Sequence, residues 1–527
     1  MGCTSSTPQE EHDVTLADYP MNNPESEAFQ LAKALRNKGA FDEADSVYQR
    51  LLNDSTLTPI EKEFIQLNQL LCRFAANDTL SVDAIPHSTH YAALSNLINA
   101  IASSRRERNS LEALYQAREQ LKEDGLANSF YYFTLLEQLG LVHKQRGSYL
   151  DSTDHYYNEA YHFTKQSDAL VPHRIRLLYR RALHSLVHRD ELTGIGYIEE
   201  AMSLRPSANW CARLFIAKAT LYRKINRPDE AALSLQEANQ RIKQLKLPEL
   251  KYLYFYEQCF QGIYAKDSLK IFSALDSLKT LSSIIPEAAH YIFHLKGHYY
   301  YERNKVDDYV FCFEKSLAAF KRNRWSSMAH IYQALYALTE GYTKKGDYSK
   351  AETYAFQSLA YATHLREEPY TFENIFNPSV QAETYNFINY DLLGSIYLER
   401  FERDKKKSYL QNAFRIYTLI DSLMLHQIRT REDESTYEFL RIGHGIYANG
   451  IETCYQLFKL TADSKYVNQA HLFMERSKSL ITYQDILKHD DQYFPSVPKT
   501  FKEKELKLKM NLSFIKSKKS KASAEEL

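Results

Sequence analysis

The apolar positions of this chain recur in pairs of amphipathic segments. In the stretch "LAKALRNKGAFDEADSVYQRLL", Ala32 lies on a first segment, Gly39 on a short polar break, and Ala44, Tyr48 and Leu51 on a second segment. Apolar residues spaced by three and four positions are typical of a helix with one buried face. The stretch therefore predicts two antiparallel helices joined by a tight turn.

The paired pattern repeats along the chain with a period of about 34 residues. Each clear copy has a small residue in its first helix and an aromatic residue or leucine in its second, whereas residues 54–95 and 245–290 match only as generic helices. Small residues let two helices approach closely, and aromatic side chains fill the space between one pair and the next. The small first-helix residues include Ala32, Gly140, Ala182, Ala219 and Gly297.

These spacings resemble those of the tetratricopeptide repeat family over most of the chain, although the first-helix tryptophan of that family is absent. The resemblance implies an all-α fold, a right-handed superhelix (α-solenoid) of about ten to twelve helical hairpins. It also implies a protein-binding scaffold, with the first helices of the hairpins lining a concave groove.

The pattern predicts five segments. Residues 1–24 form a flexible N-terminal segment, and residues 25–365 form the repeat array. Residues 366–380, with Pro369 and Pro378, form a loop or joint. Residues 381–480 form C-terminal hairpins of the same kind, and residues 481–527 form a linker and a basic helix that lead to a further domain outside this chain.

The amino-acid composition of the chain limits the classes of binding partner that we expect. The 527 residues contain 66 Lys and Arg against 66 Asp and Glu, so no net charge draws the protein to nucleic acid. No apolar run approaches the roughly 18 residues of a membrane helix. The low content of glycine (15) and proline (14) favours long helices with short turns. A neutral chain of this kind points to protein partners.

The sequence contains no signature of an enzyme site. Glycine-rich phosphate loops, the nucleophile elbow and the zinc-protease helix are all missing, so we expect no catalytic residues and no cofactor. Two histidine pairs have helical i, i+4 spacing, His184 with His188 and His294 with His298, the latter followed by Glu302. Two imidazoles and one carboxylate are too few to indicate a metal site. We therefore assign His294, His298 and Glu302 to the groove.

The repeat register places further polar and aromatic residues on the groove side of the first helices. A mixture of tyrosine, cations and carboxylates suits a peptide-binding surface, and an unoccupied solvent-facing helix would have the same composition. The groove candidates are Lys144, Arg223, Lys224, His294, His298, Tyr301, Glu302, Tyr336 and Lys344.

The C-terminal part carries a second resemblance. Ala470, Glu475, Ser477 and Lys478 form an "A-x-x-x-x-E-x-S-K" pattern, and "EKEL" at residues 503–506 follows a linker with two prolines. This order resembles the region ahead of the protease domain in bacterial repeat proteins that carry a caspase-like CHAT domain. The resemblance implies a sensing arm for a protease domain beyond Leu527. The alternatives are the repeat arm of a membrane-bound transcription regulator or sensor kinase, and a stand-alone envelope lipoprotein.

The N-terminal stretch "MGCTSSTPQEEHD" has three interpretations. Gly2 and Cys3 match the end of a bacterial lipobox, in which Cys3 carries a lipid anchor. Met1, Gly2 and Ser6 match an N-myristoylation start. The third interpretation is an ordinary terminus with an incidental cysteine. We expect a bacterial, membrane-anchored lipoprotein, with a cytoplasmic protein as the alternative.

Overall fold

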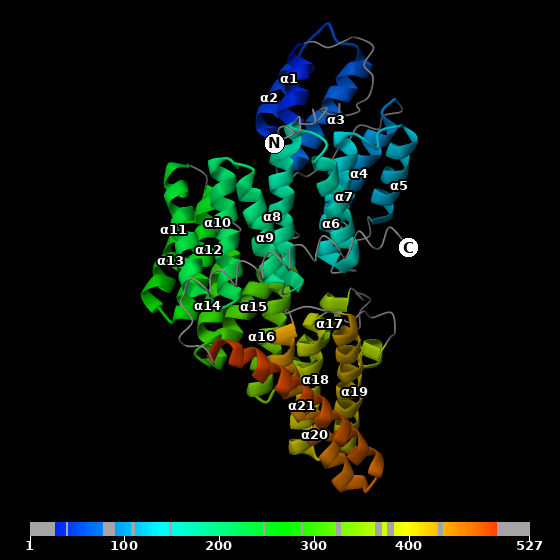
Figure 1. The fold of residues 1–527 in the computed structure, drawn as a ribbon, viewed down its shortest axis with the longest axis vertical. Helices are drawn as coiled ribbons and strands as arrows, with labels where there is room; N and C mark the ends of the chain where they lie inside the picture. The colour runs from blue at the N-terminus through cyan, green and yellow to red at the C-terminus, as the bar shows by residue number, and fades with distance from the viewer. Residues whose placement is uncertain are drawn as a thin grey trace, which may run out of the picture. The chain divides into compact units, whose positions relative to one another are not determined.

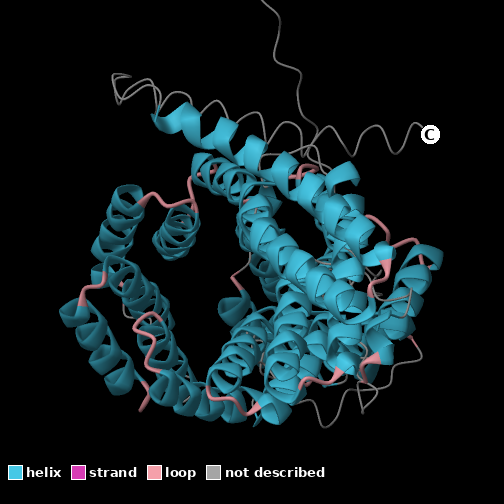
Figure 2. Ribbon diagram, turned by 90° about the horizontal axis from the view of Figure 1, so that it is seen from below, coloured by secondary structure: helices cyan, strands magenta, loops and turns pink. Residues whose placement is uncertain are grey.

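The computed structural model describes twelve stretches of the chain, and all statements below concern them. They consist of helices and loops, with no β-strand (Figures 1 and 2). The predicted all-α class is confirmed for these residues. The stretches are 27–37, 40–76, 90–106, 111–146, 150–188, 190–245, 248–285, 288–322, 328–363, 371–376, 384–430 and 436–492.

Helices α1 to α21 follow one another along the chain, with two short 3-10 helices between them. Up to residue 244 they are α1 (Glu27–Asn37), α2 (Phe41–Leu52), α3 (Pro59–Ala76), α4 (Ala92–Arg106), α5 (Leu111–Glu123), α6 (Phe130–Arg146), α7 (Leu150–Thr164), η1 (Asp168–Leu170), α8 (Val171–His188), α9 (Glu191–Ser203), α10 (Ala208–Lys224) and α11 (Pro228–Gln244). The later ones are α12 (Pro248–Ala265), α13 (Ser268–Leu281), α14 (Ala288–Tyr301), α15 (Val306–Arg322), α16 (Met328–Lys344), α17 (Tyr348–Thr363), η2 (Glu373–Phe376), α18 (Thr384–Asp404), α19 (Lys407–Thr430), α20 (Thr436–Thr461) and α21 (Ser464–Gln492).

The chain divides into two compact units. The first unit comprises residues 1–181 and 198–210, and the second comprises residues 182–197 and 211–527. Within the first unit, α4 packs on α5 and α6 packs on α7. Within the second unit, α12 packs on α13, α14 on α15, α16 on α17, α18 on α19, and α20 on α21. First helices of successive hairpins also touch, as α12 does with α14 and α14 with α16. The structure is therefore a series of helical hairpins, as predicted.

Four turns inside the hairpins of the second unit, from α10–α11 to α16–α17, share one backbone conformation. A residue in the left-handed region stands just after the first helix, for example Asn226 (φ 57°), Asn304 (φ 52°) and Gly346 (φ 73°). The next backbone N–H then donates to a carbonyl five residues earlier, as Lys305 does to Tyr300 at 3.0 Å. This closure satisfies carbonyls at the helix end and reverses the chain within a few residues.

Close approach of the two helices in a hairpin depends on glycine. A Cβ atom built on Gly297 would lie 2.9 Å from Cζ of Phe313, whose ring is fully buried on α15. The same relation holds between Gly140 and Tyr157, and between Gly394 and Tyr417. The small residue and the aromatic residue of the sequence pattern are therefore direct contact partners across the hairpin.

Substitution of Gly297 by alanine should destabilise the second unit by about 1 to 3 kcal/mol, because the added methyl group overlaps the enclosed Phe313 ring. The matched control is Gly445→Ala on α20, where a Cβ would meet nothing within 4 Å. That change should stabilise the helix by about 0.5 to 1 kcal/mol. Urea unfolding of both variants checks the opposite signs, and a stable Gly297→Ala variant would contradict the close-packing argument.

The predicted segment boundaries stay predictions, and several of them fall on residues that the structure does not describe. Residues 1–24, with Cys3, and residues 493–527, with the "EKEL" motif, lie outside the described residues. Of the predicted joint at 366–380, the structure describes residues 371–376, which include η2. The predicted limit at residue 480 falls inside α21, which continues to Gln492. Among the helices that the structure describes, none combines the length and apolar character of a membrane-spanning segment.

Candidate functional site

The first helices α10, α12, α14 and α16 of the second unit are linked by a row of polar and aromatic side chains, which we call the first-helix face. The row begins with Arg223 on α10 and Glu257 on α12. The guanidinium donates to both carboxylate oxygens, from Nε to Oε1 at 2.6 Å and from Nη2 to Oε2 at 3.0 Å. The hydroxyl of Thr220 donates to Oε2 at 2.9 Å. The two charged side chains are only 8% and 3% exposed, so this is a buried, two-point ion pair.

Aromatic rings continue the row from the ion pair towards α14. The Arg223 guanidinium lies 5.0 Å from the ring centre of Phe260 and 5.1 Å from that of Tyr264. Phe260 in turn lies 5.3 Å from the ring centre of His298. Cation–π contacts of this kind are strengthened where water is excluded. They fix the position of α10 relative to α12 and α14.

Three histidines meet at the centre of the face. Nε2 of the fully buried His294 lies 3.2 Å from Nε2 of His298 and 3.1 Å from Oε1 of Gln333 on α16. The His294 ring centre lies 5.0 Å from that of His330. The hydroxyl of Tyr256 on α12 lies 2.8 Å from Nε2 of His330 on α16. Tyr256 on α12 therefore contacts His330 on α16, although α14 lies between these two helices in the chain order. Because the first helices approach one another here, we infer that this is the inner side of a curved stack of helices.

Burial keeps these imidazoles neutral. It lowers the pKa of His298 to about 3, with smaller contributions from the positive charge of Lys224 and from His330. Burial also lowers the pKa of His330 to about 4 and that of His294 well below its ordinary value. Within the described residues, no group of three or more His, Cys, Asp or Glu side chains is placed to hold a metal ion. The cluster therefore acts as neutral, hydrogen-bonding packing.

The far end of the face carries a tyrosine, a carboxylate and a lysine. The Tyr301 hydroxyl donates to Glu340 on α16, and burial, with Tyr336 and Glu340 nearby, raises the pKa of Tyr301. Nζ of Lys344 lies 2.6 Å from Oε1 of Glu340 and donates to Oδ1 of Asn304 at 3.1 Å. Lys344 is exposed, so this lysine is accessible to a partner while its position is held.

Eight of the nine groove candidates lie in the second unit: two on α10, three on α14, one directly after α14 and two on α16. Lys224, Glu302 and Lys344 are exposed, whereas His298, Tyr301 and Tyr336 are partly buried. Arg223 and His294 are engaged with adjacent helices. Their direct contact with a ligand stays a prediction.

Lys144, the ninth candidate, lies on α6 in the first unit and is described separately. Burial and the positive charge of Arg180 lower its pKa to about 8. The neighbouring Glu137 is buried and forms ion pairs with Arg176 and Arg180 on α8. This part of α6 therefore also uses its polar residues to contact the next hairpin.

The sequence interpretation missed the partners of the groove candidates. Glu257 follows Arg223 by 34 positions, the period of the sequence pattern, whereas α12 begins 40 positions after α10, so the pair joins the end of α10 to the middle of α12. Gln333 and Glu340 follow His294 and Tyr301 by 39 positions, close to the 40 positions between the starts of α14 and α16. A search for complementary residues 34 positions later would have found the first pair and missed the other two.

A comparison of the sequence with models of known protein families found a match in two segments. Residues 28–60 and 334–369 match the model of the tetratricopeptide repeat. Two segments of the chain are therefore similar to the tetratricopeptide repeat. The first match covers α1 and α2, and the second covers most of α16 and all of α17. The predicted solenoid of helical hairpins is thereby confirmed as to its class.

A comparison with solved structures gave matches of low identity. One is a signal transduction ATPase with numerous domains from Pyrococcus horikoshii, which has a tetratricopeptide repeat sensor. It is 12% identical, with 90% of this chain and 68% of that chain covered and a TM-score of 0.41. Another is the APC/C hetero-tetramer Cut9–Hcn1, at 12% identity, 85% and 89% coverage and a TM-score of 0.32. A comparison with curated proteins gave no significant match.

Proposed function

We propose that this repeat protein is a non-catalytic interaction scaffold whose first-helix face binds a peptide segment of a partner protein. The proposal rests on one observation: side chains that hold the first helices in place lie beside exposed, charged side chains. Arg223, Glu257 and Tyr301 fix the helices, while Lys224 and Lys344 remain exposed. A surface that is ordered before binding loses less conformational freedom when a peptide docks.

The charge on this face favours an acidic peptide. Lys224 forms no ion pair with any described residue, and the histidines beside it are neutral, so its charge is not offset locally. Lys344 shares its charge with Glu340. Exposed aromatic edges and lysines are typical of surfaces that bind a carboxylate next to an apolar side chain.

Charge reversal on the first-helix face should abolish peptide capture. Random twelve-residue peptides displayed on phage are selected against the wild-type chain and then titrated by fluorescence anisotropy. The joint Lys224→Glu and Lys344→Glu variant should bind the selected peptides about tenfold more weakly or worse, because two attractions become repulsions. Lys279→Glu, at an exposed lysine on the second helix α13, is the matched control. Equal binding by all three proteins would place the peptide site elsewhere.

A more specific role is favoured by the pattern in α21. We propose that the array is the regulatory arm of a larger effector with a CHAT protease domain, as the resemblance of Ala470 to Lys478 implies. In α21 the Ser477 side chain is buried beside Nδ1 of His444 at 3.1 Å, and Lys478 pairs with Glu475 at 2.7 Å. The motif thus buries Ser477 within the hairpin and exposes Glu475 and Lys478 to solvent. The exposed pair would be accessible to a further domain.

Intact mass and terminal peptide mapping of the native protein test that role. A mass well above 61.5 kDa, with peptides that follow Leu527 and include a His and Cys pair, is expected for the effector. An added apolar stretch of about 20 residues would instead favour the membrane-bound regulator. The same spectra would show an acyl group on Cys3 if the protein is a lipoprotein, which is our proposal for its location.

A further inference from the structure

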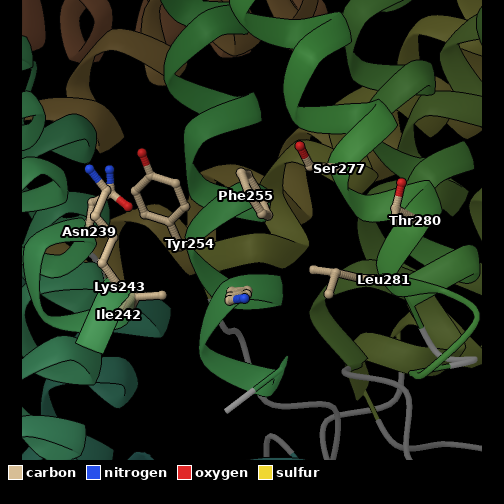
Figure 3. Close-up of a pocket in the computed structure, with 9 residues that line it drawn as sticks. Asn239, Ile242, Lys243, Tyr254, Phe255, Ser277, Thr280 and Leu281 are labelled. Atoms are coloured by element: carbon tan, nitrogen blue, oxygen red, sulfur yellow. The ribbon is translucent and has the colours of Figure 1, made fainter. Parts of the chain in front are cut away.

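A cleft opens on the side of the second helices, away from the face described above. It has a volume of about 480 Å³ and lies between α11 and α13, with α12 beneath it (Figure 3). Tyr254 and Phe255 form its floor, and Ile242 and Leu281 flank them. The remaining lining residues are Asn239, Lys243, Lys251, Ser277 and Thr280.

The cleft exists because the core of the second unit is interrupted at α12. One apolar cluster joins α10, α11 and the start of α12 through Ile216, Leu235 and Leu250, and Tyr254 packs on its edge. A separate cluster joins α12, α13 and α14, and Phe255 packs on that one. The two rings lie 5.2 Å apart at an interplanar angle of 67°. Because Tyr254 packs on one cluster and Phe255 on the other, the two rings lie between the clusters. Their exposed parts form an apolar floor that is open to solvent.

The walls of the cleft are polar and short, so they do not fill it. Asn239 on α11 faces Ser277 and Thr280 on α13 across the floor (Figure 3). From α15 to α21, by contrast, the buried residues form one continuous cluster. The cleft lies at this seam between hairpins and is roughly large enough for one aromatic side chain with its backbone.

The rim of the cleft carries positive charge that nothing in the described chain balances. Lys243 at the end of α11 and Lys251 near the start of α12 are both exposed, and neither forms an ion pair with a described residue. The Tyr254 phenol is partly buried, and burial raises its pKa, so it stays a neutral hydrogen-bond donor. An apolar floor beneath two lysines fits a group that is apolar at one end and anionic at the other.

We propose that this cleft is a second peptide-binding site, which takes an aromatic side chain followed by acidic residues in a partner protein. The aromatic ring packs on Tyr254 and Phe255, and the carboxylates meet Lys243 and Lys251. Backbone amides of the peptide pair with the polar walls. The hydroxyls of Ser277 and Thr280 donate to the carbonyls of Ser273 and Asp276 on their own helix, at 2.9 and 3.0 Å, and their oxygens can still accept from peptide amides. With the Asn239 amide on the opposite wall, these acceptors favour a peptide over an alkyl chain, which would leave them without a partner. The site extends the proposed scaffold to two faces of one array.

The test uses fluorescein-labelled Gly-Ser-Trp-Glu-Glu-Gly-Ser as a probe, titrated against the full chain by fluorescence anisotropy. We expect saturable binding that falls about tenfold or more in the joint Lys243→Glu and Lys251→Glu variant, because two attractions become repulsions. Ser277→Phe, which fills the cleft from α13, should abolish binding. Lys279→Glu, which makes one charge reversal of the same kind on α13 outside the cleft, should leave it unchanged. Circular dichroism confirms that each variant keeps its helices.

Further measurements distinguish this peptide site from the first-helix face and from a site for small organic acids. A peptide with Ala in place of Trp, or with Lys-Lys in place of Glu-Glu, should not bind. The Lys224→Glu and Lys344→Glu variant should bind the probe normally, so that failure of the first-helix face leaves the present proposal intact. Binding of decanoate without binding of the probe would show a site for organic acids and overturn the proposal. Equal binding by wild type and the Ser277→Phe variant would overturn it as well.

Discussion

We expect the Arg223→Ala variant to lose about 3 to 5 kcal/mol of the unfolding free energy of the second unit. The reason is the position of Glu257, whose side chain is only 3% exposed. Without the guanidinium, this carboxylate keeps the Thr220 hydroxyl as its hydrogen-bond donor and has no cation beside it. A buried charge without a partner costs several kcal/mol, far more than an exposed ion pair contributes.

The loss is measured by urea unfolding and by hydrogen exchange of the amides in α10 and α12. Exchange is needed because an array of repeats need not unfold in one step. The cost should be local, with the largest loss of protection at the seam between these two helices. Amides in α20 and α21 should exchange at the wild-type rate, since they belong to a different part of the core.

A double variant separates loss of the pair from exposure of the unpaired charge. Arg223→Met with Glu257→Met removes both charges and keeps much of the volume, so its stability should return to within about 1 to 2 kcal/mol of wild type. If the double variant is as unstable as Arg223→Ala, packing against Phe260 and Tyr264 would be the main contribution of Arg223. The ion pair would then not be what fixes α10 on α12.

The hairpins could be predicted from the sequence because their determinants are local. Gly297 and Phe313 belong to one hairpin, and so do Gly140 and Tyr157, so their spacing along the chain reports their contact directly. The tight turn at Gly346 is also local, because glycine tolerates the left-handed conformation. At Lys266 the same conformation occurs on a residue type that does not favour it, so no comparable signal marks that turn in the sequence.

The use of the first-helix face could be predicted only in part. The register places Arg223, Lys224 and His294 on one side of their helices, as the structure has them. It does not tell which side chain meets solvent and which meets the next hairpin. That depends on the residue opposite, such as Glu257 for Arg223 or Gln333 for His294, and on the length of the connection between hairpins. The cleft at α12 was missed for the same reason, because it arises from an interruption between two clusters.

The histidine cluster makes the second unit sensitive to acid. His294, His298 and His330 are neutral in the folded state because burial lowers the pKa of each, to about 3 for His298 and about 4 for His330. In the unfolded chain they titrate near 6.5. Between pH 6.5 and the folded pKa values the unfolded state binds more protons, so stability falls as pH falls. The positive charges of Lys224 and Arg223 add to the cost of protonating His298.

Lowering the pH from 7.5 to 5.5 should therefore cost the second unit about 1.4 kcal/mol for each of these histidines, or about 4 kcal/mol together. Urea midpoints across this range measure the slope. His298→Gln keeps a hydrogen-bonding group beside His294 and should remove about a third of the slope, because one titrating site is lost. His471→Gln, at an exposed histidine on α21, should leave the slope unchanged. Equal slopes for wild type and His298→Gln would mean that His298 has the same pKa in the folded and unfolded states, and it would then become positively charged at the lower end of this pH range, towards any acidic peptide on the first-helix face.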